Sequence, residues 1–131
     1  MKMAAIKSTV ALIGMIIGFY MGPLDVTIWL LLAAVTADYI SGVVAAICTK
    51  TLDSNVGYKG LLRKILIFIV VGAGHVVDEL MTPGESLIRT ALIAYYLANE
   101  GISILENTAR AGLPVPDRIR RALEQLQDDN K

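Results

Sequence analysis

Ionisable side chains that interrupt long apolar runs are the residues of this sequence most suited to chemistry. Asp38 interrupts the run 26–48, and Glu100 interrupts the run 87–105. Carboxylates act as acids, bases or metal ligands when a nucleophile or further ligands accompany them. The sequence has one histidine, one cysteine and no motif of a nucleophile elbow, a phosphate loop or a zinc site. We therefore expect no enzyme, no cofactor and no metal.

Polar residues around Glu100 are spaced to lie on one side of a helix. At about 100° per residue, the first line of them falls within roughly a 60° arc. This line consists of Arg89, Tyr96, Glu100, Ser103 and Asn107, and Asn99 and Glu106 form a second line beside it. Polar residues on a spanning helix face the interior or a water path. They either form hydrogen bonds to neighbouring helices or line a pore that opens on assembly.

Asp38 shares its predicted helix face with small residues, including Gly42 and Ala45 at steps of three and four. A charge at mid-bilayer costs at least ~2.5–3.5 kcal/mol. Asp38 must therefore face protein or water, or be protonated. We expect Asp38 and Gly42 to lie in a helix–helix contact, as part of oligomer packing, or in a lumen wall.

Gly14, Gly18 and Gly22 recur at steps of four in the first apolar run. Four residues is about one helical turn, so the glycines form a groove on one face. Such a groove lets another backbone approach closely in lipid. The partner is either a second copy, which makes the glycines oligomer-packing residues, or another helix of the same chain.

These residues require long helices to position them. The chain has 131 residues, 55% of them hydrophobic and 18% charged, whereas soluble domains carry about a quarter charged residues. A spanning helix needs roughly 20 mainly apolar residues, and helices are predicted over 4–22, 26–49, 61–80 and 86–107. We expect an all-α integral membrane protein of one domain, 1–131, with four transmembrane helices, or three if the first is only interfacial.

Two other interpretations of the apolar runs are disfavoured, namely a soluble helical bundle and a secretory signal peptide. A soluble bundle would carry a polar stripe on every helix, but the stretch 8–22 contains no charge at all. A secretory signal peptide would end at a small-residue cleavage site. The first run ends instead at Tyr20-Met21-Gly22-Pro23, so we expect it to be kept as a helix.

Basic residues are strongly biased to one side of this four-span arrangement. Both termini and the middle loop share a side, which holds all of the 12 basic residues except Arg89. Because cytoplasmic loops collect lysine and arginine, both termini are predicted to be cytoplasmic. At the outer end of the third helix, His75, Asp78 and Glu79 form a solvated or ion-paired helix end, with Arg89 a candidate partner.

The predicted cytoplasmic tail is 108–131. Pro114 and Pro116 break the chain before a short amphipathic C-terminal helix, whose Ile119, Ala122, Leu123 and Leu126 recur at helical spacing. Its arginines at 118, 120 and 121 can gain about 1 kcal/mol each from anionic lipid. An interfacial helix, an inter-subunit contact and a solvated tail all fit this pattern.

The most specific motif is the string Asn99-Glu100-Gly101-Ile102-Ser103-Ile104-Leu105-Glu106-Asn107. Lys59-Gly60 followed by Arg63-Lys64 opens the third apolar segment, and Gly112 with the two prolines follows the fourth. Together with Asp38 and Gly42, these residues resemble phage holin family 4, the toxin-secretion and phage-lysis holins. The resemblance extends from about the second segment to Pro116.

The resemblance implies a small pore-forming protein of the bacterial inner membrane. Holins of this kind accumulate harmlessly, then assemble as homo-oligomers into lesions at a set time. The lesions release a muralytic endolysin, or in some relatives a large toxin, without a direct contact being necessary. The partners expected are therefore a second copy and the lipid bilayer. The balance of 12 acidic and 12 basic residues gives no sign of nucleic-acid binding.

Two rival functions fit a chain of this size. A small four-helix transporter usually carries a carboxylate in its first helix, where this chain has none, so Asp38 would have to serve. A non-catalytic membrane scaffold subunit would need no such group. Inducible expression separates the three: a holin halts growth abruptly, a transporter alters tolerance to a solute, and a scaffold alone does neither.

Overall fold

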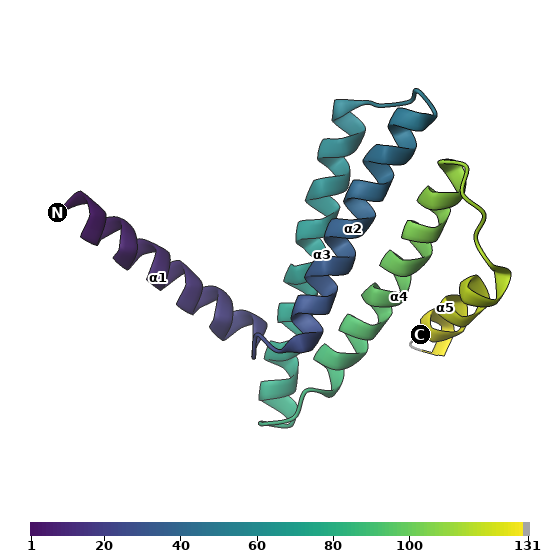
Figure 1. Cartoon of the computed structure of the whole chain (residues 1–131). Helices are drawn as coiled ribbons and strands as arrows, with labels where there is room; N and C mark the ends of the chain where they lie inside the picture. Colours follow the sequence, from purple (N-terminus) through teal and green to yellow (C-terminus); the bar gives the residue numbers. More distant parts are fainter. Residues whose placement is uncertain (130–131) are drawn as a thin grey trace.

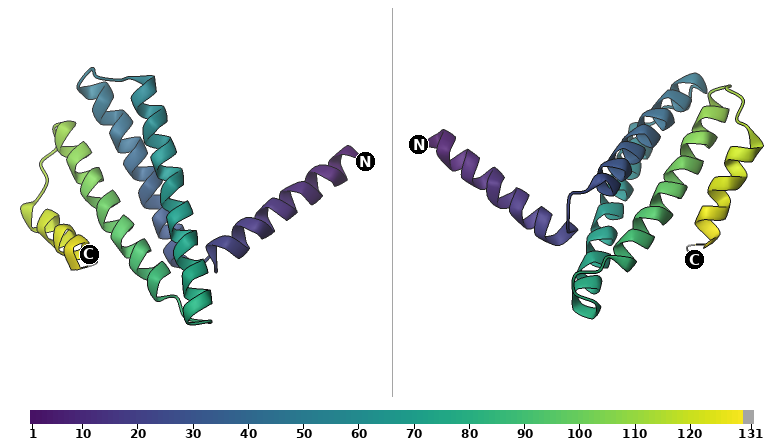
Figure 2. Two further views of the ribbon diagram at one scale, coloured as in Figure 1. Left: turned by 180° about the vertical axis from the view of Figure 1, so that it is seen from behind. Right: turned by 60° about the horizontal axis from the view of Figure 1, so that its bottom comes forward.

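A computed structural model describes residues 1–129, which form five α-helices and no strands. The helices are α1 (Lys2–Met21), α2 (Val26–Cys48), α3 (Ser54–Met81), α4 (Leu87–Arg110) and α5 (Asp117–Asp129). Helices α2, α3 and α4 lie side by side, whereas α1 points away from them (Figures 1 and 2). The expected all-α class is confirmed for the described residues.

Aspartates define where two of the long helices begin. The Asp25 carboxylate accepts hydrogen bonds from the backbone N–H groups of Thr27 and Ile28, and so caps α2. Asp53 accepts from the N–H of Asn55 and caps α3. The third helix therefore begins at Ser54 rather than at 61, because the cap lets its polar first turns stay helical. The loop before it is correspondingly shorter than predicted.

The core lies where α2, α3 and α4 meet. Buried apolar side chains from the three helices, joined by Met21, form one cluster: Met21, Ile28, Leu31, Val35, Ile67, Val71 and Ile93. A Cβ added at Gly74 of α3 would touch the side chain of Leu92 on α4. The absence of a side chain at this position therefore lets α3 and α4 approach closely.

Only the end of α1 touches the bundle. The Tyr20 hydroxyl donates a hydrogen bond to the Ile69 carbonyl oxygen at 2.6 Å, and the Tyr20 ring lies where a Cβ at Gly72 would be. Gly22, with φ of 76°, ends the helix over the ring of His75. Gly22 is thus a place where a left-handed backbone and a close approach both require glycine.

The outer surface differs between helices. Large apolar side chains are exposed along α1, α2 and α3, whereas α4 exposes only Leu87 among the described residues. By length and composition, α1, α2 and α3 could each cross a membrane, and α4 falls short of that standard. From the sequence we expected α1, and not α4, to be the helix that is only interfacial if three helices span. Helix α4 falls short because it carries all seven residues of the predicted polar stripe.

Helix α5 folds back beside α4, as both views show (Figures 1 and 2). Within the described residues, α4 is the one helix that α5 contacts. The side chains of Leu123 and Leu126, and all of Lys131, lie outside the described residues. The structure therefore shows a C-terminal helix, whereas its predicted lipid-facing role is not tested.

Candidate functional site

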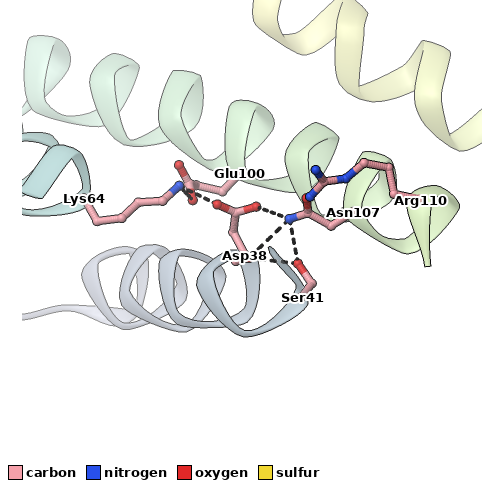
Figure 3. A network of polar contacts seen from close by, with 6 residues as sticks. All are labelled: Asp38, Ser41, Lys64, Glu100, Asn107 and Arg110. Carbon is pink, nitrogen blue, oxygen red and sulfur yellow. Dashed lines mark hydrogen bonds and ion pairs between the residues drawn. The ribbon is translucent and has the colours of Figure 1, made fainter. Parts of the chain in front are cut away.

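A buried ion network joins the three helices of the bundle (Figure 3). The ammonium of Lys64 on α3 lies 2.5 Å from Asp38 Oδ2 on α2 and 2.5 Å from Glu100 Oε2 on α4. Asp38 is 6% exposed and Glu100 is 4% exposed. One cation from α3 therefore bridges two carboxylates, one on α2 and one on α4, and it links the three helices at this point of the bundle.

Asn107 extends the network along α4. Its amide nitrogen donates to Asp38 Oδ1 at 3.0 Å and to Ser41 Oγ at 3.0 Å, while its carbonyl oxygen accepts from Arg110 at 2.8 Å (Figure 3). Gly42 lies directly beside the Asn107 amide. The formal charges of the four ionisable members, Asp38, Lys64, Glu100 and Arg110, sum to zero.

The network is open at one side. A cavity of about 370 Å³ reaches it from the loop between α2 and α3, and its walls include Asp38, Lys64, Ser103 and Asn107. Asp38, Glu100 and Asn107 are buried between the packed helices, whereas Arg110 is exposed. This arrangement can hold water beside the charged groups without exposing them to lipid.

Arg89 forms a second buried cluster at the other end of the bundle. Its side chain is 2% exposed and donates to Met21 O at 2.9 Å, to Pro23 O at 2.7 Å and to Asp25 Oδ2 at 3.1 Å. The guanidinium thus satisfies carbonyl groups left free where α1 ends. It fastens the connection between α1 and α2 to the first turn of α4.

Asp78 completes this second cluster from α3. Its two carboxylate oxygens accept from the backbone N–H groups of Ile88 and Arg89, at 2.9 and 2.8 Å. A carboxylate at a helix N-terminus is favourable because of the exposed N–H groups and the helix dipole. The predicted charge pairing of Arg89 with this end of α3 is therefore wrong for the described residues: Asp78 binds the backbone N–H of Arg89, and the guanidinium pairs with Asp25.

Asp25 is the ionisable member of the second cluster that lies in the loop between α1 and α2. The Thr27 hydroxyl donates to this carboxylate and lowers the pKa of Asp25 to about 2, against an ordinary value of 3.8. Partial burial acts in the opposite direction, and Arg89 lowers the pKa further. Asp25 is consequently ionised at neutral pH.

The predicted stripe on α4 faces the inside of the protomer rather than solvent. Arg89, Glu100 and Asn107 are buried, Tyr96 packs against the core, and Ser103 lines the cavity. Asn99 is half-buried beside them, while Glu106 is exposed. In this structure the buried stripe residues bond to neighbouring helices of the same chain. That the stripe lines a pore in an assembled form stays a prediction.

Two groups of residues were expected to pack between copies: Asp38 with Gly42, and the three glycines of the first apolar run. The structure uses some of them inside the protomer and leaves others open. Asp38 and Gly42 lie against α4 of the same chain, so their face is occupied within the protomer. Gly14 and Gly18 have no neighbouring atom within 4 Å of an added Cβ, whereas Gly22 packs on His75. Of these three glycines, only Gly22 packs within the chain. Gly14 and Gly18 are open to another partner.

Sequence reasoning missed Lys64 as a site residue. We assigned it to the cytoplasmic charge bias because it follows Lys59 and Arg63, but its ammonium enters the bundle. The signal was its place on the face of α3 that continues through Ile67 and Val71, at steps of three and four. Without Lys64, the basic bias still favours the same side by ten residues to one.

Three comparisons place this chain among known proteins. The family model described as bacteriophage holin family matches residues 15–128. An uncharacterised protein of Clostridium perfringens is 38% identical over 125 residues, which cover 95% of this chain and 93% of that protein. An uncharacterised protein of Listeria monocytogenes is 40% identical over 110 residues, 84% of this chain and 78% of its own length.

A relative with an assigned role comes from a phage. The probable holin of Bacillus phage phi105 is 37% identical over 93 residues, which cover 71% of this chain and 68% of that protein. No solved structure matches this chain. Because the family model covers most of the chain and the phage relative covers more than two thirds of it, this protein is a member of the bacteriophage holin family.

Proposed function

We propose that this protein forms pores in the bacterial inner membrane by homo-oligomerisation and releases an endolysin, or a large toxin, at a timed point. The observation that carries the proposal is the contrast within one chain between a charge-paired bundle and an apolar helix attached to it only at one end. A bundle with paired charges can accumulate harmlessly in lipid, and the unattached part of the apolar helix can recruit further copies. Family membership supports the same role.

The paired charges also support a fourth span. Helix α4 falls short of the apolar standard because of Arg89 and Glu100, but both side chains are buried and bonded to Asp25 and Lys64. Lipid would not meet either charge, so the insertion cost of ~2.5–3.5 kcal/mol for each unpaired charge does not apply in full. Helix α4 has 24 residues, enough to cross the hydrocarbon core. Both termini would then be cytoplasmic, as the basic bias favours.

Assembly would begin at α1. Its apolar side chains are exposed along its length, and the Gly14–Gly18 face is open. Close backbone approach at such a face drives helix association in lipid. Pore opening then requires the α4 stripe to exchange its contacts within the protomer for water. Because association depends steeply on concentration, lysis would follow a threshold in the amount of protein.

The direct test is inducible expression together with an endolysin that lacks its own export signal. We expect growth to continue normally and then stop abruptly, with lysis only when both proteins are present. Gly14→Leu with Gly18→Leu should delay lysis and reduce crosslinked oligomers. Thr9→Leu places a leucine on the opposite face of α1 and should leave both unchanged. Lysis without delay in the glycine variant would exclude the glycine face from assembly.

Glu100→Gln tests the stripe separately from assembly. It removes one charge from the network and keeps the shape of the side chain, so insertion should be unaffected while the time of lysis changes. Glu85→Gln is the control, because Glu85 is exposed in the turn between α3 and α4 and lies outside the stripe. Wild-type timing for Glu100→Gln would show that the stripe has no part in opening.

A small transporter is the second candidate, and the cavity beside Asp38 and Lys64 is the observation that favours it. A transporter needs a water-accessible ion site inside the bundle, which this cavity could supply. Expression would then alter tolerance to a solute and would release no cytoplasmic protein. Release of endolysin activity to the outside excludes this alternative.

A further inference from the structure

The contact between α4 and α5 conflicts with the proposed fourth span. Glu100 points into the bundle, toward Lys64. Ala98, two residues earlier, points about 200° away from Glu100 around the helix. Ala98 is nevertheless only 3% exposed. Since α5 is the one further helix that contacts α4 in the described part of the chain, α5 covers this back face of α4.

Helix α5 is far too polar to remain there in lipid. Seven of its 13 residues are charged: Asp117, Arg118, Arg120, Arg121, Glu124, Asp128 and Asp129. It starts beyond the end of α4 and runs back along it (Figure 2). If α4 crosses the bilayer, α5 in this position lies at the depth of the hydrocarbon core, where each unpaired charge is strongly disfavoured.

The basic charges of α5 are confined to one end. The three arginines occupy its first turns with Asp117, next to the end of α4, and the other acidic residues, Glu124, Asp128 and Asp129, follow them. Arg118, Arg121 and the apolar side chain of Ile119 are exposed. A helix with arginines beside apolar residues is suited to lie in the interface of an anionic membrane.

The segment between the helices permits such a movement. Residues 111–116 contain Gly112, with φ of 98°, followed by Pro114 and Pro116. Gly112 adopts the left-handed conformation that ends α4, and the prolines prevent a continuous helix from forming across the segment. The orientation of α5 is therefore set by what it packs against, and not by the end of α4.

We propose that α5 has two mutually exclusive positions, the back of α4 and the surface of an anionic membrane, and that insertion of α4 requires α5 to leave it. The surface partner is the phosphate-rich face of anionic lipids, which the three arginines recognise. Departure of α5 leaves the back of α4, at Ala98, free to contact lipid or a second copy. This inference rests on the four-span topology of the proposed function.

Spin labels in the full-length protein test both positions. In a Cys48→Ser background, labels at Ala94→Cys on α4 and Glu124→Cys on α5 report whether the helices are in contact; both positions are exposed. A single label at Ala122→Cys reports the depth of α5. Vesicles of phosphatidylcholine alone are compared with vesicles that also contain phosphatidylglycerol.

We expect the two labels to be well separated in every vesicle and the Ala122 label to lie at headgroup depth only with phosphatidylglycerol. Replacing the three arginines by glutamine should weaken surface binding roughly a hundredfold, from the gain per basic residue near anionic lipid. Replacing them by lysine keeps the charge and should preserve binding. High salt should reproduce the glutamine result.

Two outcomes overturn the inference. One is a close Ala94–Glu124 pair in vesicles in which an impermeant reagent reaches Glu85→Cys and Leu113→Cys from opposite sides, because α4 then spans with α5 still attached. The other is labelling of both cysteines from the same side, because α4 then does not span. Neither readout uses lysis, so a protein that fails to lyse cells but behaves as expected here would contradict only the proposed function.

Discussion

Helices α2 and α3 of the bundle expose large apolar side chains as α1 does, but the bundle and α1 are held in place by different forces. The bundle is tied by charges: Lys64 joins Asp38 and Glu100 across three helices. Helix α1 is attached only at its end, through the Tyr20 hydroxyl and the carbonyls that Arg89 binds. In lipid, apolar contact between helices gives little advantage over contact with lipid. Hydrogen bonds and ion pairs between helices therefore account for a larger share of the association than they do in water. Polar bonds therefore join the helices of the bundle to one another, whereas the apolar stretch of α1 is not buried against the described protomer.

Removal of Lys64 should produce the largest loss. Lys64→Met leaves two buried carboxylates side by side without a cation, and breaking a buried pair in this way costs about 3–5 kcal/mol. Unfolding in mixed micelles should show this loss in the free energy of unfolding. Lys64→Arg keeps the charge and should retain most of the stability. Equal stability of the methionine variant and wild type would show that the network does not hold the bundle.

Removal of Arg89 should affect the junction between the two regions. Arg89→Met deletes three hydrogen bonds made by a charged group, with an expected loss of about 2–3 kcal/mol, because Asp25 is partly exposed and can recover water. Arg63→Met, at an exposed arginine, is the control and should change the free energy of unfolding little. If both variants lose the same amount, the Arg89 cluster has no special structural role.

Gly72→Ala should act on α1 without touching the ion network. The added methyl would overlap the Tyr20 ring, and overpacking costs typically about 1–3 kcal/mol unless α1 moves away. Gly60→Ala, on the same helix with open space around it, should instead gain up to about 1 kcal/mol from helix propensity. Spin labels on α1 and α3 would show whether α1 has separated. Unaltered stability and spacing would mean that the Tyr20–Gly72 contact is dispensable.

Acid should weaken the junction between α1 and α2 that Asp25 helps to hold. The pKa of Asp25 is lowered from 3.8 to about 2 by the Thr27 hydroxyl and Arg89. Its contribution to stability is therefore full above about pH 4 and is lost as the pH falls toward 2. Asp25→Asn should be less stable than wild type at pH 6, and the difference should shrink toward pH 2. A difference that stays constant over this range would contradict the assignment.

The smallest effect on the protomer is expected at Gly14 and Gly18. Neither has a neighbour, so alanine at both positions should leave the free energy of unfolding unchanged or raise it by up to about 1 kcal/mol per site. The fraction of oligomer, measured by crosslinking in vesicles, should fall. A loss of protomer stability would mean that the glycines pack inside the chain after all.

Much of the fold follows from local pattern. Long apolar runs bounded by Gly, Pro and Asp predict helices because each run can satisfy its backbone only as a helix in lipid. The predicted boundaries of α1 and α2 lie close to those found, whereas α3 begins earlier because the Asp53 cap outweighs its polar first turns. The spacing on α4 likewise identified Arg89, Glu100 and Asn107 as sharing a face.

The sequence by itself thus determined a hydrophobic, all-helical chain with a polar face on α4, because periodicity and length are local properties of a chain. Only the tertiary structure decided what that face meets. Lys64 and Asp38 are far from Glu100 along the chain, and a charge shows no preferred partner until helices are placed beside one another. The same holds for α1 and α5, since helical period reveals which side is apolar but not which neighbour, lipid or protein, will cover it.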